Sequence, residues 1–220
     1  MSKKAWFYVA FFAVLVAGFY VALTSLIPDF SKRQLPVLSY LQPFSFTNQR
    51  GRIITDEDVQ GKVFVAEYFF TTCKGICPKM NRNMQEVYLK FKDNPDFRIL
   101  SHTVDPGTDS VLRMKQYADS LHADPSNWWF LTGPKDSLYL MARKSYLLES
   151  RDNDTIPIEE QFIHTQFFSL VDREGRIRKI YDGLKKEDLD ALEKDIKTLL
   201  NEKPGKAKIM SSPFKGWPVN

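Results

Sequence analysis

Strand-length segments alternate with helical segments along most of the chain, and this alternation constrains the fold more than any other feature. Residues 62–70 form a nearly continuous apolar run, which is typical of a central strand covered on both faces. A short hairpin is expected before it, at 44–55. After it, strands are expected at 97–104, 128–132, 166–171 and 177–181, and helices at 78–91, 108–121, 135–148 and 185–201. Such alternation requires parallel strands joined by crossovers, so we expect an α/β fold with a mixed central sheet flanked by helices.

The N-terminal residues predict a transmembrane helix. No charged residue occurs between positions 5 and 27, and a helix of this length, about 34 Å, can cross a hydrocarbon core of about 30 Å. A cleaved signal peptide would have a shorter apolar region and a small-residue cleavage site, so we expect residues 1–27 to be an uncleaved anchor. Lys3 and Lys4 favour a cytoplasmic N-terminus, although Lys32 and Arg33 lie close beyond the other end. We therefore expect the soluble part on the periplasmic side of the inner membrane.

The rest of the chain is expected to form a linker, one domain and a tail. Residues 28–43 contain prolines at positions 28, 36 and 43 and predict a linker. Residues 44–203 are long enough for one domain with a full core, and residues 204–220 are expected to form a flexible tail. The net charge of +4 is too small and too scattered for a nucleic-acid-binding protein. The chain has only two cysteines, close together, which excludes a disulfide-stapled scaffold.

Cys73 and Cys77 are the residues that most clearly indicate chemistry. They lie between the strand at 62–70 and the helix at 78–91, at the carboxyl end of a strand, where α/β folds gather their ligands. Their spacing brings two sulfurs to one face of a helical turn. Since a helix N-terminus stabilises a thiolate, we expect lowered thiol pKa values. Such a pair either binds a metal or reacts with a disulfide. Two inert core cysteines are the alternative.

A metal held by two thiolates needs a further ligand, and the chain has three histidines. His102 lies within an apolar strand and His122 at the end of a helix, so we expect structural roles for both. His164 lies at the entrance to a strand and is expected at the same sheet end as the cysteines. Two thiolates and an imidazole suit Cu(I) well and Zn(II) less specifically. We therefore predict a metal site formed by Cys73, Cys77 and His164.

Three further residues near the cysteines permit more than one interpretation. Glu67 is the only charged residue within positions 63–70. An unpaired buried carboxylate is costly and has a raised pKa, so Glu67 could relay protons to a thiol; otherwise it pairs with Lys62 or faces a polar rim. Met80 and Met84 could offer thioether ligands, but methionines at helical spacing are more typical of core packing.

Several sequence blocks resemble the Sco/SenC family of copper chaperones. Residues 71–78 resemble its pattern T-x-C-x-x-x-C-P, and residues 103–106 contain its V-D-P block. Further similar blocks are 130–133, His164 with 168–172, and 181–183. The resemblance covers about residues 43–200, and each block alone is weak, but their shared order and spacing are specific.

The resemblance implies a thioredoxin-like fold and one copper ion per chain, Cu(I) or Cu(II), bound by the two cysteines and the histidine. It also implies a function in delivering copper to, or maturing, the binuclear copper centre of cytochrome c oxidase. The expected partner is the copper-site subunit of that oxidase or another copper-receiving client. The chain departs from the family at Lys74 and Gly75, where Pro and Asp are usual, and at Phe69, where Gly is usual. The missing acidic residue bears on partner choice and on affinity for Cu(II).

A thiol–disulfide oxidoreductase acting on an extracytoplasmic client is the alternative function, with Cys73 and Cys77 as its redox pair. Oxidoreductases of the thioredoxin type mostly use C-x-x-C and a cis-proline before the facing strand. This chain has three residues between its cysteines, and His164 stands where that proline is expected. A peroxidase of the peroxiredoxin type needs a threonine three residues before its reactive cysteine, where Phe70 and Lys74 occur instead. We therefore expect mainly a metallochaperone, with an additional enzymatic activity left open.

Overall fold

The computed structural model describes residues 2–26, 35–149, 157–158, 161–163 and 165–202. The chain divides into two units, Met1–Pro36 and Val37–Asn220. Three predicted features lie outside the described residues: His164, the first part of the linker at 28–34, and the tail at 204–220.

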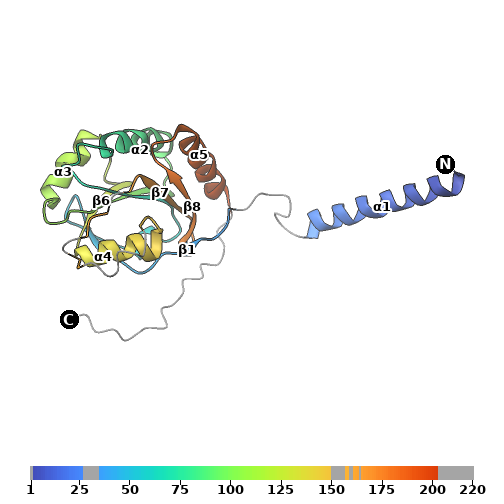
Figure 1. Ribbon diagram of the computed structural model, residues 1–220, viewed down its shortest axis with the longest axis horizontal. Coiled ribbons are helices and arrows are strands. Elements are labelled where there is room, and N and C mark those ends of the chain that lie inside the picture. Colours follow the sequence, from blue (N-terminus) through green and yellow to red (C-terminus); the bar gives the residue numbers. More distant parts are fainter. Residues whose placement is uncertain (1, 27–34, 150–156, 159–160, 164, 203–220) are drawn as a thin grey trace, which may run out of the picture. The chain divides into compact units, whose positions relative to one another are not determined.

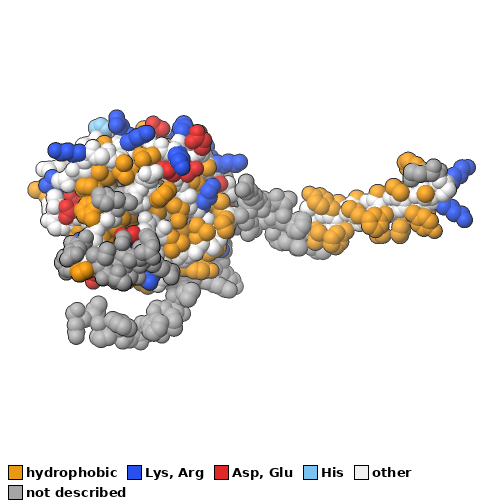
Figure 2. Space-filling model, viewed as in Figure 1, with side chains coloured by type: hydrophobic (Ala, Val, Ile, Leu, Met, Phe, Trp, Pro, Cys, Tyr) orange, Lys and Arg blue, Asp and Glu red, His pale blue; other side chains and the backbone are white. Residues whose placement is uncertain are grey.

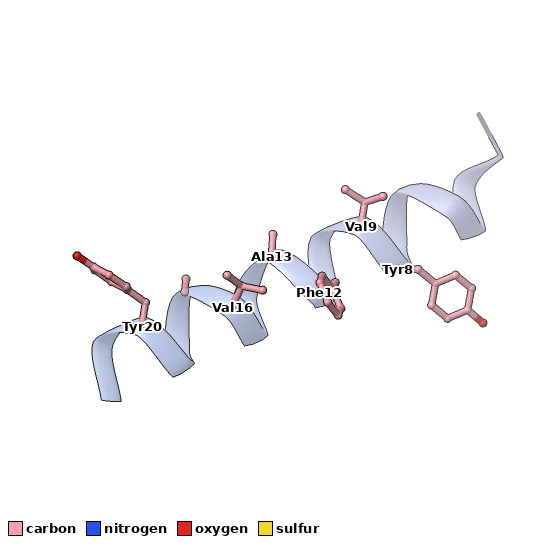
Figure 3. A pocket seen from close by; sticks show the side chains of 7 residues that line it. Tyr8, Val9, Phe12, Ala13, Val16 and Tyr20 are labelled. Atoms are coloured by element: carbon pink, nitrogen blue, oxygen red, sulfur yellow. The ribbon is translucent and has the colours of Figure 1, made fainter. Parts of the chain in front are cut away.

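In the N-terminal unit, helix α1 (Lys3–Leu26) is long and apolar enough to cross a membrane over Lys3–Ser25, and none of this span is buried within the protein. Hydrophobic side chains cover its length, and lysines occur only at its start (Figure 2). A groove along α1 between Tyr8 and Tyr20 is lined by apolar and aromatic side chains of α1 alone (Figure 3). That lining holds no thiol, carboxylate or imidazole. The helix agrees with the apolar segment predicted at 1–27.

The second unit is built on a mixed sheet, which has eight strands in the described part of the chain, in the order β1-β8-β7-β4-β5-β6-β2-β3. The pairs β4–β5 and β5–β6 are parallel, and the other neighbours are antiparallel. The strands are β1 (Ser39–Tyr40), β2 (Ser45–Asn48), β3 (Ile53–Thr55), β4 (Val63–Phe69), β5 (Phe97–Thr103), β6 (Trp128–Thr132), β7 (Phe167–Val171) and β8 (Arg176–Asp182). The predicted α/β architecture with a mixed sheet is confirmed.

Helices cover both faces of this sheet (Figure 1). On one side lie α2 (Cys77–Phe91), α3 (Val111–Ser120) and α5 (Lys186–Asn201); on the other lie α4 (Lys135–Leu140) and the π-helix Met141–Tyr146. A short 3₁₀ helix, Asp56–Val59, follows β3.

Strand β4 is buried along its whole length, as its apolar sequence predicted. Its alternate side chains enter two different layers. Tyr68 donates its hydroxyl to the Leu138 carbonyl of α4 at 2.7 Å, whereas the ring of Phe69 stacks on Tyr117 of α3. Because side chains alternate along a strand, Glu67 shares the layer of Phe69, between the sheet and the helices that follow the cysteines.

The structure differs from the predicted helix at 135–148. The α-helix ends at Leu140 and continues as a π-helix, and Leu147 stops it in the left-handed conformation, with φ of 57°. Two polar side chains of the π-helix, Ser145 and Tyr146, are buried and form hydrogen-bond contacts. Ser145 Oγ accepts the Gln42 backbone N–H at 2.9 Å, and the Tyr146 hydroxyl lies 3.2 Å from His102 Nε2.

Residues 39 and 40, which we placed in the linker, form strand β1 at the edge of the sheet. Ser39 is paired with Ile177 of β8, and the Leu41 N–H donates to the Gly175 carbonyl at 2.7 Å. This pairing satisfies backbone groups of β8 that would otherwise be left at an open edge. The two-residue strand is too short to leave a pattern in the sequence.

Candidate metal and redox site

The two cysteines lie where the sequence predicted, at the carboxyl end of β4. The chain leaves β4 after Phe69, turns through a loop in which the Cys73 N–H donates to the Phe70 carbonyl at 3.2 Å, and enters α2 at Cys77. Pro78 occupies the first turn of α2, where its missing N–H is harmless. Both cysteines are free thiols. Cys73 is partly exposed and Cys77 is buried, so the pair has one accessible and one protected sulfur.

Both cysteines line one small cavity of about 20 Å³. The other lining residues are mainly apolar: Tyr68, Phe69, Phe70, Ile76, Val104, Ile163 and Thr165. Ile163 and Thr165 are the two neighbours of position 164 in the sequence. The fold therefore brings the segment on either side of that position to the cysteine pocket, although His164 itself lies outside the described residues.

The expected lowering of the thiol pKa is wrong for Cys77, whose pKa is raised to about 12. Burial is the largest cause, because the cavity withholds water from a charged sulfur. The hydrogen bond with the Cys73 side chain raises the pKa further, and a backbone hydrogen bond with Phe70 offsets this only in part. At this position the effect of burial, which raises the pKa, is thus larger than the effect of the helix N-terminus, which lowers it. A soft metal ion that replaces the proton could stabilise the Cys77 thiolate in this pocket without water.

Glu67 lies in the layer beneath the cysteines and is fully buried. Ser101 Oγ donates to its Oε1 at 2.6 Å, and Trp128 Nε1 donates to Ser101 Oγ at 2.9 Å. Burial raises the pKa of Glu67 to about 7. The alternative that Glu67 pairs with Lys62 is wrong, because Lys62 forms its ion pair with Asp96 at 3.0 Å.

Asp109 is a residue near the site that our sequence analysis did not select. It is fully buried and accepts hydrogen bonds from Thr71, two residues before Cys73, and from Thr103 at the end of β5. Its place in the loop after β5, beside the carboxyl end of β4, is the signal that could have identified it, because these two strands are parallel neighbours.

Of the other candidates, His102, Met80 and Met84 are buried in the core, whereas His122 is exposed. His102 is fully buried, its ring stacks on Tyr68, and burial lowers its pKa to about 3. His122 follows the end of α3 in the left-handed conformation, with φ of 52°. Met80 and Met84 of α2 are both fully buried in the core, as their spacing predicted.

Within the described residues, no cluster of three or more His, Cys, Asp or Glu side chains could hold a metal ion. The described part of the site supplies two thiols, a small apolar pocket and one sulfur open to the surface. Two soft thiol donors in such a setting suit Cu(I).

Comparisons with known proteins all identify similarity to Sco proteins. The family model described as SCO1/SenC matches residues 33–201. The SCO1 protein homolog of Bacillus subtilis is 34% identical over 165 residues, 74% of this chain and 84% of that protein. The solved structure of BsSco, a member of the Sco family of cytochrome c oxidase assembly proteins with an identified disulfide switch, has a TM-score of 0.65 at 32% identity. It covers 78% of this chain and 100% of its own. ScoI of Bradyrhizobium japonicum with copper bound has the same fold, with a TM-score of 0.57 at 24% identity over 73% of this chain and 99% of its own.

Proposed function

The chain belongs to the SCO1/SenC family, and we propose that it is a membrane-anchored protein that binds copper and delivers it to, or helps to mature, the binuclear copper centre of cytochrome c oxidase. The observation that carries the proposal is the pocket that Cys73 and Cys77 share with Ile163 and Thr165. Cys73 comes from the loop after β4 and Cys77 from the first residue of α2, whereas Ile163 and Thr165 come from a segment far along the chain.

We propose Cys73, Cys77 and His164 as the ligands of one copper ion per chain. The histidine belongs in the set because both of its sequence neighbours line the cysteine pocket. A third ligand from that segment would complete a two-sulfur, one-nitrogen donor set, which suits Cu(I). Copper-bound structures exist for relatives of the same fold, such as ScoI of Bradyrhizobium japonicum.

The proposed location follows from α1. A helix that can cross a membrane, followed by a linker from position 28, would tether the domain that ends near position 203 to the inner membrane, with the tail at 204–220 beyond it. Lys3 and Lys4 favour the periplasmic side for the domain. The copper-receiving partner is then the copper-site subunit of the oxidase or another client with an exposed copper site on that side.

Thiol–disulfide exchange is the second candidate function, and the unequal exposure of the two cysteines favours it. Cys73 is open to the surface and Cys77 is buried beside it. In an exchange reaction the accessible sulfur attacks a client disulfide, and the buried sulfur then displaces the client as Cys73 and Cys77 form their own disulfide. The disulfide switch identified in BsSco belongs to a relative with 32% identity.

The test is copper stoichiometry of the reduced full-length chain in detergent after Cu(I) loading and removal of excess metal. The wild type is expected to retain one copper, and Cys73→Ala, Cys77→Ala and His164→Ala are expected to lose it. His122→Asn is the matched control, since it removes an exposed imidazole at a left-handed position that asparagine tolerates.

The outcomes test the ligand set and the choice between the two candidate functions. Full copper retention by His164→Ala would remove the histidine from the ligand set. A reduced wild type that binds no copper but reduces a client disulfide would favour the oxidoreductase. Oxidation to a Cys73–Cys77 disulfide is expected to abolish copper binding, because a disulfide sulfur is no longer a thiolate donor.

A further inference from the structure

We propose that Asp109 is a positioning residue that fixes the backbone just before Cys73 and thereby sets the geometry of the cysteine pair. The inference rests on the proposed function, because it takes Cys73 and Cys77 as the working thiols. Asp109 acts through Thr71, and only Thr72 separates Thr71 from Cys73. A displacement of Thr71 is therefore passed on to the first sulfur of the pair.

The contacts of Asp109 come from two neighbouring strand ends. The Thr71 backbone N–H lies 3.3 Å from Asp109 Oδ1 and 3.2 Å from Oδ2, and the Thr71 hydroxyl donates to Oδ1. The Thr103 hydroxyl donates to Oδ2 at 2.5 Å. Thr103 ends β5 and is paired in register with Phe69, the last residue of β4. One fully buried carboxylate thus joins the exits of both strands.

The direction of each hydrogen bond follows from the partners of the two hydroxyls. Thr71 Oγ1 accepts from Arg113 Nε at 2.8 Å, and Thr103 Oγ1 accepts from the Asp105 backbone N–H at 3.0 Å. A hydroxyl has one hydrogen, so both hydroxyls point that hydrogen at Asp109. Asp109 therefore receives donors only, which an ionised carboxylate satisfies and an amide does not.

The position of Asp109 is itself fixed by the surrounding backbone. The Asp109 N–H donates to the Asp105 carbonyl at 2.9 Å, and Ser110, the next residue, caps α3 by accepting the Arg113 N–H. Arg113 returns from the first turn of α3 to the Thr71 hydroxyl. The start of α3 and the end of β5 thus hold the cysteine loop at one point.

A matched buried acid elsewhere supplies the control. Asp172 is 2% exposed and has direct ion pairs with Arg176 and Arg178. It follows Val171, which is paired with Phe64 near the start of β4, so Asp172 lies at the sheet end opposite to the cysteines. Its loss is expected to affect stability without affecting the thiols.

The experiment compares Asp109→Asn, Thr71→Val, Thr71→Ser and Asp172→Asn with the wild type, as full-length chains in detergent. Three quantities are measured: Cu(I) affinity by competition with a chelator, the equilibrium of the Cys73–Cys77 disulfide with a dithiol in metal-free protein, and thermal unfolding. Substitutions beyond the ligands themselves commonly weaken metal binding about 10- to 100-fold. We expect this loss for Asp109→Asn and Thr71→Val.

The disulfide of these two variants is also expected to be about tenfold easier to reduce, equivalent to about 30 mV, because a looser loop holds the sulfurs together less often. Thr71→Ser keeps the hydroxyl and is expected to restore wild-type values. Asp172→Asn is expected to lower the unfolding temperature and keep Cu(I) affinity. A folded Asp109→Asn variant with wild-type affinity and disulfide equilibrium would overturn the inference.

If Asp109→Asn does not fold, the comparison of Thr71→Val with Thr71→Ser decides: equal affinities and equal disulfide equilibria would refute the positioning role. The metal-free disulfide measurement separates this inference from the proposed function. A wild type without copper affinity would end the copper proposal, while the disulfide equilibrium would still test Asp109.

Discussion

The substitution Glu67→Gln is expected to stabilise the folded protein above neutral pH and to leave its stability nearly unchanged in acid. Glu67 is fully buried, and burial raises its pKa from 4.5 to about 7. Between these values the folded state binds more protons than the unfolded state, so the free energy of unfolding falls as pH rises. The stability linked to the protonated carboxyl is fully present below pH 4.5 and is lost as pH rises through about 7.

The size of the effect follows from the same two values. The interval from 4.5 to about 7 corresponds to about 3 kcal/mol, at about 1.36 kcal/mol per pKa unit. Glutamine keeps a carbonyl that can accept the Ser101 hydroxyl, but it cannot ionise. The stability of the Glu67→Gln variant therefore lacks this pH dependence. For a domain of this size, 1 kcal/mol shifts the unfolding temperature by about 2–4 °C, so the variant should gain about 6–12 °C over the wild type at pH 8.

The assay is thermal and denaturant unfolding of reduced, metal-free protein at several pH values between 4.5 and 8. Glu57→Gln is the matched control, because it makes the same chemical change on an exposed side chain. The difference between Glu67→Gln and the wild type should grow through this range, and that for Glu57→Gln should not. A constant difference across the range would refute the reasoning, because it would show that the Glu67 carboxyl ionises equally in the folded and unfolded states.

Two further predictions concern packing. Gly183→Ala should lower the free energy of unfolding by about 1–3 kcal/mol, because a Cβ there would lie 2.5 Å from the Phe168 ring and 2.8 Å from the Gln166 carbonyl oxygen. Gly75→Ala is the control, because its Cβ would meet nothing within 4 Å. Equal denaturation midpoints for the two variants would contradict the argument. Met84→Ala should cost about 2–5 kcal/mol by leaving a cavity, because Met84 is fully buried. Unchanged copper stoichiometry in that variant would support its assignment to the core, whereas loss of the metal at retained stability would make it a ligand.

The parts of the fold that could be predicted are those in which a local pattern matches the final environment. The run at 63–69 is apolar except for Glu67, and the strand it forms is buried on both faces. The position of Cys73 and Cys77 followed from the strand before them and the proline after them. The hairpin around Gly175 is likewise local, because its φ of 72° is a conformation that glycine adopts without cost.

The parts that could not be predicted depend on what lies around a residue in three dimensions. The helix start predicted a lowered pKa for Cys77, but burial in the folded chain raises it. Lys62 is near Glu67 in sequence, yet Asp96 is its partner. Asp109 is a common residue in a loop, and only the pairing of β4 with β5 shows that it meets Thr71.

If the N-terminal unit is held in a membrane, as proposed, strand β1 has a mechanical consequence. Any pull arriving through Pro36 would act first on the pairing of β1 with β8, where the Leu38 N–H donates to the Ile177 carbonyl and the Leu41 N–H to the Gly175 carbonyl. Two further strands, β8 and β7, stand between this edge and β4. Strain transmitted through the linker would separate β1 from the edge of the sheet before it reached Cys73 and Cys77. The cysteine loop would therefore be protected from movements of the N-terminal unit.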